Sequence, residues 1–507
     1  MWKHANVQPV HKKDSRQIVS NYRPISLLPI FGKNFEKIMF DSMYSFFQTN
    51  NLITSNQSGF IPRDSTINQL LSITTEIFEA FESYDEVRAV FLDMSKAFDK
   101  VWHEGLIFKL KQNGLNGQTL KILTNYLSNR KQRVVINGIQ SEWKPILSGV
   151  PQGSILGPLL FLIYINDLTD NIISNIKLYA DDSSLFARVR DVNTTHDQLM
   201  TDLDSITKWA NDWKMKFNPE ISKQAIEVIF SAKYKKASHP LLDFNGIPVA
   251  RESSTKHLGI TLDERLTFRK HIKEAISKAK KGLALMKFLS KYLTPKVLDQ
   301  TFKMYVRPHL DYGDVIFHNQ LVDMMDSLES IQYQAGLIVS NCWKGTNKDK
   351  LYKQLGWESL AQRRIFRRFS LFYKILNYET PSYLKNHIHP LPSRRTQRFE
   401  RSFFPFCQLN WDSIDDNTKN ASNLAQFKKR YLNEIRPPPS SFFGIDDKYG
   451  VRLLFKLRVD FSDLRRHRSD HNFNCLSPIC KCNIEDESTE HFLTRLSPFH
   501  CSTRDPY

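Results

Sequence analysis

The sequence predicts an α+β protein with several subdomains. Its 507 residues, of which 41% are apolar, are enough to bury a large core. Residues 86–270 alternate short apolar runs with helical patterns, which is typical of a sheet covered on one face by helices. Residues 271–390 have a mostly helical and basic pattern. Beyond them, prolines such as Pro390, Pro392 and those at 437–439 indicate linkers.

Two helices are expected before residue 86. Apolar residues recur at helical spacing over residues 31–47. A second helix is predicted over residues 67–81, because the segment 64–66 just before it supplies side chains that cap a helix N-terminus. The short apolar runs 89–92, 176–178 and 185–187 are predicted strands.

The charge of the chain favours a polyanionic partner and is unevenly distributed. The formal net charge is +18 and the isoelectric point is near 9.4. Residues 1–250 carry 28 Lys and Arg against 25 Asp and Glu, whereas residues 251–507 carry 43 against 28. If the ligand is nucleic acid, most phosphate contacts are therefore expected in the second half. A basic surface that only keeps the protein soluble gives the same composition.

Composition also excludes several classes of protein. The N-terminus lacks the apolar core of a signal peptide, and the longest apolar run, residues 159–165, is too short to span a bilayer. Six cysteines do not form a disulfide scaffold in a chain of this length. Four of them follow residue 470, which indicates a local site in a reducing compartment. We therefore expect an intracellular protein without a membrane segment.

Three carboxylates stand at the ends of predicted strands. Asp181 and Asp182 lie between the apolar runs 176–178 and 185–187, and adjacent carboxylates at the tip of a hairpin repel each other unless a cation compensates. An ordinary exposed turn has the same local pattern. Asp93 ends the apolar run 89–92 and supplies a third carboxylate. A Gly/Pro-rich segment separates the two strand ends, at residues 149–158.

These segments, in this order, resemble the palm of a reverse transcriptase. The resemblance narrows to the polymerase of a jockey-type non-LTR (LINE) retrotransposon through three further segments, residues 21–28, 91–99 and 161–168. It covers the chain from residue 2 to about residue 504. It implies a right-hand polymerase fold with an antiparallel palm sheet. The implied parts are fingers (1–85), palm (86–270), helical thumb (271–390), a basic linker or tail (391–470) and a Cys/His zinc-knuckle-like end (471–507).

The resemblance implies an RNA-directed DNA polymerase that extends a DNA 3′-hydroxyl on an RNA template. Asp93, Asp181 and Asp182 would hold two Mg²⁺ ions, because phosphoryl transfer places charge on phosphate oxygens that such ions neutralise. Asp93 and Asp181 would contact both ions, and Asp182 would have a lesser part. The implied partners are the RNA template, the DNA primer or target, and deoxynucleoside triphosphates.

Further residues receive roles in substrate binding from the same resemblance. Phe98 stands where the family has an aromatic gate that excludes a 2′-hydroxyl; by itself it is an ordinary core residue. Gln152 and Gly153 resemble the loop beneath the incoming nucleotide, although a simple turn has the same composition. Lys223 lies near the position of a lysine proposed to protonate pyrophosphate; a solvated surface lysine is the alternative. The segment 256–263 resembles the primer-grip strand.

Arg23 and Arg63 are the candidates for binding the triphosphate. Relatives usually read Gly-Phe-Arg where this chain reads Gly-Phe-Ile at residues 59–61. Arg63 stands two residues after Ile61 and is the candidate replacement.

The C-terminal cysteines form a candidate zinc site. Cys475, Cys480, Cys482 and His491 have ligand-like spacing, and so short a tail needs a metal to fold alone. The spacing is not that of a standard zinc finger, and relatives have a cysteine where this chain has Leu496. Either Cys501 substitutes as a ligand or the site is damaged.

The chain starts at about the first fingers motif, so the endonuclease domain that usually precedes it is expected to be missing, and the target nick would come from elsewhere.

Two other functions remain open. A catalytically silent RNA-binding relic would keep the palm and thumb without polymerising. A splicing-assisting maturase shares the palm but is disfavoured by the jockey-like segments. As the protein of a mobile element, it is expected in a cytoplasmic and nuclear ribonucleoprotein, although no localisation signal is evident.

Overall fold

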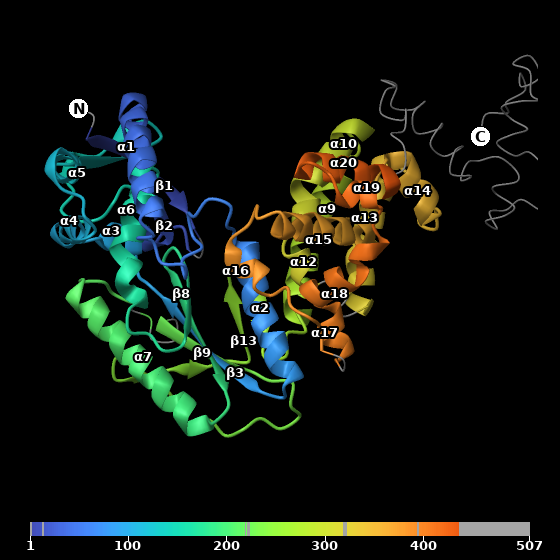
Figure 1. Ribbon diagram of the computed structural model, residues 1–507. Helices are drawn as coiled ribbons and strands as arrows, with labels where there is room; N and C mark the ends of the chain where they lie inside the picture. The colour runs from blue at the N-terminus through green and yellow to red at the C-terminus, as the bar shows by residue number, and fades with distance from the viewer. Residues whose placement is uncertain are drawn as a thin grey trace, which may run out of the picture. The chain divides into compact units, whose positions relative to one another are not determined.

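A computed structural model describes residues 3–12, 15–218, 220, 224–317, 322–392 and 395–435 (Figure 1). The side chains of residues 434 and 435 are not described. Two compact units divide the chain between Leu266 and Thr267. The first unit holds the strands of both large sheets, and the second is helical in its described part.

A five-stranded sheet forms the centre of the first unit. Its strand order is β12-β9-β3-β8-β7, and all neighbours are antiparallel except β12 and β9. The central strand β3 is buried over seven of its eight residues, as expected of a strand with neighbours on both sides. The strands are β3 (Glu86–Asp93), β7 (Asn175–Tyr179), β8 (Asp182–Val189), β9 (Ala225–Phe230) and β12 (Ala250–Arg251).

Helices α6 and α7 cover one face of this sheet, so the predicted α+β arrangement is confirmed. Val90 of β3, Ile176 of β7 and Leu185 of β8 share a core cluster with both helices. Nine of the ten residues of α6 are buried, as expected of a helix that is apolar on all sides. The helices that contribute to this core are α1 (Ile30–Thr49), α3 (Ala97–Lys100), α4 (His103–Gln112), α5 (Gly117–Leu127), α6 (Leu156–Ile165) and α7 (Val192–Asp212).

Helix α2 (Thr66–Glu82) contacts the other side of the sheet. Along β7, Asn175 and Lys177 alternate with the core residue Ile176 and therefore point away from α6 and α7. Glu76 of α2 accepts a 2.6 Å hydrogen bond from Asn175 and lies 3.4 Å from the ammonium group of Lys177. The predicted cap is present, because the Ser65 side chain accepts from the amide of Asn68.

The first unit contains a second sheet. Its order is β2-β1-β4-β5, with β6 also paired to β4. β1 and β4 are parallel although about 120 residues separate them, whereas β1 and β2 are antiparallel. The strands are β1 (His4–His11), β2 (Tyr22–Leu27), β4 (Lys131–Ile136), β5 (Ile139–Gln140) and β6 (Lys144–Pro145). Short 3-10 helices are η1 (Val19–Asn21) and η2 (Asn166–Thr169).

Two small hairpins complete the first unit. The first pairs β10 (Asp243–Phe244) with β11 (Ile247–Pro248), and the second pairs β13 (Ser254–His257) with β14 (Ile260–Asp263). The turn of the second is Leu258-Gly259, and both residues have positive φ, as a tight two-residue hairpin requires.

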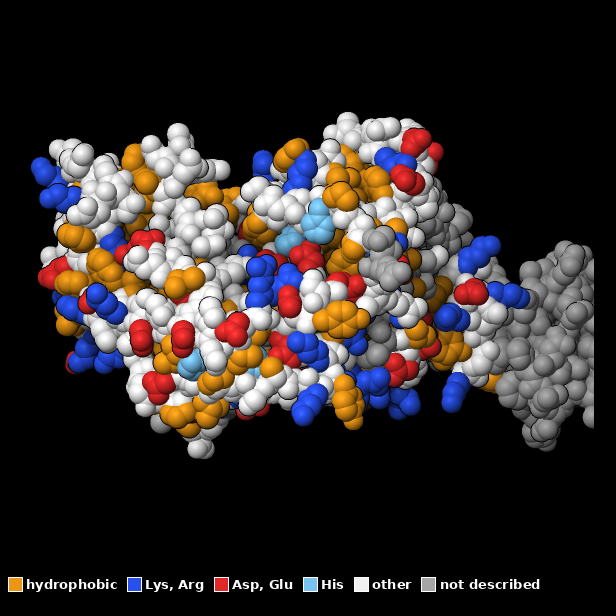
Figure 2. All heavy atoms as spheres, turned by 60° about the horizontal axis from the view of Figure 1, so that its bottom comes forward, with side chains coloured by type: hydrophobic (Ala, Val, Ile, Leu, Met, Phe, Trp, Pro, Cys, Tyr) orange, Lys and Arg blue, Asp and Glu red, His pale blue; other side chains and the backbone are white. Residues whose placement is uncertain are grey.

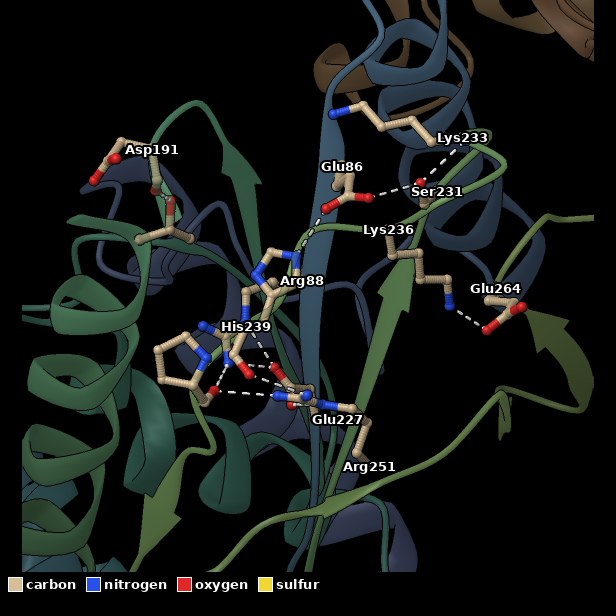
Figure 3. Close-up of polar contacts among 12 residues, drawn as sticks. Glu86, Arg88, Asp191, Glu227, Ser231, Lys233, Lys236, His239, Arg251 and Glu264 are labelled. Carbon is tan, nitrogen blue, oxygen red and sulfur yellow. Dashed lines mark hydrogen bonds and ion pairs between the residues drawn. The ribbon is translucent and has the colours of Figure 1, made fainter. Parts of the chain in front are cut away.

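A buried polar network fixes the chain at the start of β3 (Figure 3). Arg88 and Glu227 are fully buried and form an ion pair at 2.6 Å, and Arg251 pairs with the other oxygen of Glu227 at 2.8 Å. Glu86, also buried, accepts hydrogen bonds from Ser231 at 2.9 Å and contacts His239 at 2.8 Å. The network joins β3, β9, β12 and the connection between them at the end of β3 opposite to Asp93.

The described part of the second unit is helical. The residues between 271 and 390 agree with the predicted helical pattern. No helix within the described ranges is long and apolar enough to cross a membrane. The helices are α9 (Arg269–Leu289), α10 (Pro295–Thr301), η3 (a π-helix, Phe302–Val306), α11 (Arg307–Asp311), α12 (Asp314–Phe317), α13 (Val322–Ser340), α14 (Lys348–Leu355), α15 (Leu360–Leu376), α16 (Ser382–Lys385), α17 (Gln397–Arg401), α18 (Phe403–Asn410), η4 (Trp411–Ser413), α19 (Asp416–Lys419) and α20 (Leu424–Ile435).

Candidate active site

Three carboxylates meet at one end of the central sheet. Asp93 is the last residue of β3 and is the direct cross-strand partner of Asp182, the first residue of β8. Side chains of such partners lie on the same face of a sheet, about 5 Å apart at Cβ. Asp181 precedes Asp182 in the turn that connects β7 to β8. Asp93 and Asp182 are exposed and Asp181 is half-buried, so all three are open to solvent.

The carboxylates perturb one another. Although Asp182 still reaches solvent, partial desolvation of its carboxylate, followed by the charges of Asp181 and Asp93, raises its pKa to about 6. Burial and the charge of Asp93 also raise the pKa of Asp181, while the nearby charges of Lys12 and Arg23 act in the opposite direction. The cluster therefore favours a bound cation or proton that relieves the repulsion.

Asn218 was not singled out by the sequence, yet it holds Asp93. Its side-chain amide donates to Oδ2 of Asp93 at 2.7 Å, and its backbone N–H donates to the Asp93 carbonyl at 2.9 Å. The residues next to each of them, Met94 and Phe217, form an isolated antiparallel bridge. Lys12, directly after β1, is the second missed residue, since its charge acts on Asp181 and Asp182. No local pattern marks either residue.

The Gly/Pro-rich loop, residues 149–158, packs against Asp99 and against β2. Gly149 has φ +89°, and a Cβ there would lie 2.7 Å from the Asp99 carbonyl oxygen. Gly153 has φ +104°, and its Cβ would lie 2.8 Å from the Ser26 carbonyl oxygen. The Gln152 side chain donates to Asp99 at 3.0 Å. The loop thus needs glycine at both positions, and it joins the segment after Asp93 to β2.

The Phe98 ring lies in an aromatic stack. It is parallel to the Phe161 ring of α6, with centroids 4.4 Å apart and an interplanar angle of 18°. The Phe60 ring meets it edge-on at 6.0 Å. Phe98 is half-buried, so its ring is fixed by packing and still reaches the surface. This is compatible with a steric gate and with a core residue alike.

The donor set at the sheet end fits Mg²⁺. Within the described ranges, no group of three or more His, Cys, Asp or Glu side chains is arranged to hold a metal ion as it stands. Mg²⁺ does not require such a cage, because it binds through one or two carboxylates and takes phosphate oxygens and water as its other ligands. The accessible oxygens of Asp93, Asp181 and Asp182 and their mutual repulsion suit this mode of binding.

The order of these features along the chain matches a known family. Residues 10–262 match the family model described as "Reverse transcriptase (RNA-dependent DNA polymerase)". This segment includes all three carboxylates, the glycine-rich loop and Phe98. It belongs to the reverse transcriptase family.

Two curated relatives of this chain come from mobile elements of Drosophila melanogaster. The RNA-directed DNA polymerase from mobile element jockey is 32% identical over 54% of this chain and 30% of its own length. The probable RNA-directed DNA polymerase from transposon BS is 28% identical over 80% of this chain and 45% of its own length. The predicted jockey-type resemblance is confirmed. The chain spans less than half the length of these relatives.

Solved structures give only weak similarity. Apo telomerase from Candida tropicalis covers 76% of this chain, and 63% of its own chain is covered, with a TM-score of 0.41 and 10% identity. The RNA-dependent RNA polymerase of a human picobirnavirus gives a TM-score of 0.34 at 13% identity, over 66% of this chain and 58% of its own.

The remaining residues that the sequence predicted for substrate or metal binding lie in different parts of the chain. Arg23 is exposed on β2, close enough for its charge to act on Asp181. Arg63 is exposed in the turn before α2, with φ +68°, and its carbonyl accepts from the Asn68 side chain. Ile61 is half-buried beside it. Some predicted residues lie outside the described ranges: Lys223, Cys475, Cys480, Cys482, His491 and Cys501.

The segment predicted to resemble a primer grip forms the β13–β14 hairpin. His257 is buried and its ring lies 5.0 Å from that of Phe91 on β3. Burial lowers the pKa of His257 to about 4, so this imidazole is neutral at physiological pH. The hairpin is thereby packed on the same strand that ends in Asp93.

Proposed function

We propose that this chain is an RNA-directed DNA polymerase of a jockey-type non-LTR retrotransposon. It would extend a DNA 3′-hydroxyl on an RNA template with deoxynucleoside triphosphates. The observation that carries the proposal is the meeting of Asp93, Asp181 and Asp182 at one accessible sheet end, inside a segment of the reverse transcriptase family. The named activity of the curated relatives supports it.

In the proposed reaction Asp93, Asp181 and Asp182 would hold Mg²⁺ near the phosphate of the incoming nucleotide. When bound, the metal neutralises phosphate oxygens and makes the primer hydroxyl a better nucleophile. Asn218 keeps the Asp93 carboxylate in one orientation through its 2.7 Å hydrogen bond. Positioning of this kind is a large part of catalysis in phosphoryl transfer.

The remaining residues would bind the nucleotide. Arg23 and Lys12 place positive charge near the carboxylates, where a triphosphate would lie. Arg63 would contribute if its exposed side chain turns toward the same place. Gln152 and Gly153 form the loop that packs against β2, and the Phe98 ring, held by Phe161, would exclude a 2′-hydroxyl. The fingers, palm and thumb would be formed by residues 1–85, 86–270 and 271–390.

Incorporation of labelled dTTP on poly(rA)/oligo(dT) with Mg²⁺ tests the proposal. Wild-type protein should incorporate label, and Asp181→Asn should lower the rate about 10³-fold, which corresponds to about 4 kcal/mol of barrier. The matched control is Asp204→Asn, because Asp204 is an exposed carboxylate on α7 away from the carboxylate cluster. Wild type that binds the RNA but incorporates no label would contradict the proposal and identify a silent RNA-binding relative.

A further inference from the structure

A strap formed by residues 56–60 is fixed to the strand that leads into the carboxylate turn. The Leu178 amide donates to the Asn56 carbonyl at 2.9 Å, and the Ser58 amide donates to the Leu178 carbonyl at 2.9 Å. Gln57 and Leu178 form an isolated parallel bridge. The Gln69 side chain of α2 donates to the same Leu178 carbonyl at 2.8 Å. The strap is therefore tied to β7 just before Asp181 and Asp182.

The Gln57 side chain connects the strap to the turn itself. It is only 5% exposed, and its Oε1 accepts from the Gly59 amide at 2.7 Å and the Ala180 amide at 2.9 Å. Because two N–H groups converge on one atom, this atom must be the oxygen of the amide. The Gln57 nitrogen, also buried, has no hydrogen-bond partner within the described ranges. The Gln57 side chain therefore acts as a hydrogen-bond acceptor for two backbone amides, those of Gly59 and Ala180.

Ala180 needs such support. It has φ +55°, a left-handed conformation that residues with a Cβ rarely adopt, and it lies directly before Asp181. The strap approaches it closely, because a Cβ on Gly59 would lie 2.3 Å from the Ala180 nitrogen. A rotation of the Ala180 backbone would turn the two following carboxylates away from Asp93. The hydrogen bond from Ala180 to Gln57 opposes this rotation.

We propose that Gln57 is a positioning residue that holds the Ala180 amide and thereby aims Asp181 and Asp182. The inference rests on the proposed polymerase function and extends it to a residue that touches neither metal nor substrate. The same strap continues into Phe60, whose ring meets Phe98 at 6.0 Å. One segment thus contacts both the carboxylate turn and the gate ring.

Two variants and one control separate positioning from general stability. Gln57→Met keeps the length of the side chain and removes the acceptor, whereas Gln57→Glu keeps an acceptor for both amides. Gln112→Met is the control, because Gln112 is exposed at the end of α4. The measurements are peptide-level hydrogen exchange over residues 176–186, the midpoint of thermal unfolding, and kcat and KM for dTTP.

In Gln57→Met, the backbone amides of residues 176–186 should exchange about tenfold faster than in wild type. In Gln57→Glu, these amides should stay as protected as in wild type. In Gln57→Met, kcat should fall about 10–100-fold while KM for dTTP changes less than threefold, because the substrate contacts remain. The unfolding midpoint should stay close to that of the control. If hydrogen exchange in Gln57→Met were unchanged, the inference would be wrong. It would also be wrong if the lower kcat were explained by a lowered midpoint of thermal unfolding. If wild type does not polymerise, the proposed function fails, and hydrogen exchange alone decides whether Gln57 holds the turn.

Discussion

At the scale of single residues, the carboxylate cluster combines accessibility with repulsion. Asp182 faces Asp93 across the strands and follows Asp181 along the chain, and its pKa is raised to about 6. A group whose pKa is raised on folding binds protons more strongly in the folded state. The free energy of unfolding therefore falls as pH rises from about 4 to about 6, and the loss persists above this window.

Asp182→Asn should accordingly stabilise the metal-free protein at pH 7.5. We expect a gain of about 1 kcal/mol or less, since Asp182 is exposed and solvent screens the repulsion. The difference should vanish near pH 4. With millimolar Mg²⁺ the order should reverse, because the ion binds the folded wild type better. Unfolding in EDTA and in Mg²⁺ checks this, with Asp204→Asn as control; a metal-free variant less stable than wild type would contradict it.

The Phe98 ring gives a second prediction at this scale. Phe98→Val should admit ribonucleotides, because the shorter side chain leaves room for a 2′-hydroxyl. Discrimination, measured as the ratio of kcat/KM for dTTP and UTP, should fall roughly 10–200-fold. Phe108→Val is the control, since Phe108 is 54% exposed on α4. Unchanged discrimination in Phe98→Val would leave Phe98 as a core residue only.

At the scale of secondary-structure elements, the two ends of β3 differ in burial and in function. One end carries the exposed carboxylate of Asp93, and the other end contains the buried polar network of Glu86, Arg88 and Glu227 (Figure 3). Local signals predicted the elements themselves: the apolar run of β3, and the Ser65 cap of α2. The pairing of β1 with β4 had no such signal, because parallel pairing depends on contacts between distant segments.

Glu227→Gln tests the closed end of β3. The substitution leaves Arg88 fully buried without its carboxylate partner, and a buried unpaired charge costs about 3–5 kcal/mol. Denaturant unfolding should show this loss, while Glu142→Gln, an exposed residue in the loop before β6, should change stability by less than about 0.5 kcal/mol. A loss below about 1 kcal/mol for Glu227→Gln would mean that Arg88 finds other partners.

At the scale of the whole molecule, the second half of the chain carries most of the net positive charge. The face drawn in Figure 2 mixes basic, acidic and apolar side chains. Helix α9 is the strongest exception, since it carries exposed lysines and a single acidic residue, Glu274. Three of these lysines are Lys273, Lys280 and Lys281. The helix is thus the best local candidate for the phosphate contacts expected in the second half.

Replacing Lys273, Lys280 and Lys281 by Gln should weaken RNA binding and reduce its salt dependence. Each phosphate contact contributes about 0.7–0.9 to the slope of log K against log salt, so the slope should fall by about 2. Titrations of RNA at several salt concentrations measure it. The comparison variant replaces Lys111, Lys121 and Lys131, three exposed lysines of the first unit. If the slope of log K against log salt were the same for both variants, phosphate contacts by α9 would be contradicted.

The sequence alone determined the family segments, the strand ends that carry the three carboxylates, and the helical second unit, because these depend on apolar periodicity and on residues near in sequence. Only the tertiary structure revealed the hydrogen bond between Gln57 and Ala180, which are 123 residues apart. The same holds for the hydrogen bond between Asn218 and Asp93, which are 125 residues apart. Both are hydrogen bonds between side chains and groups that folding brings together. A single glutamine or asparagine gives no periodic or local signal of such a bond, so its partner is decided by the fold.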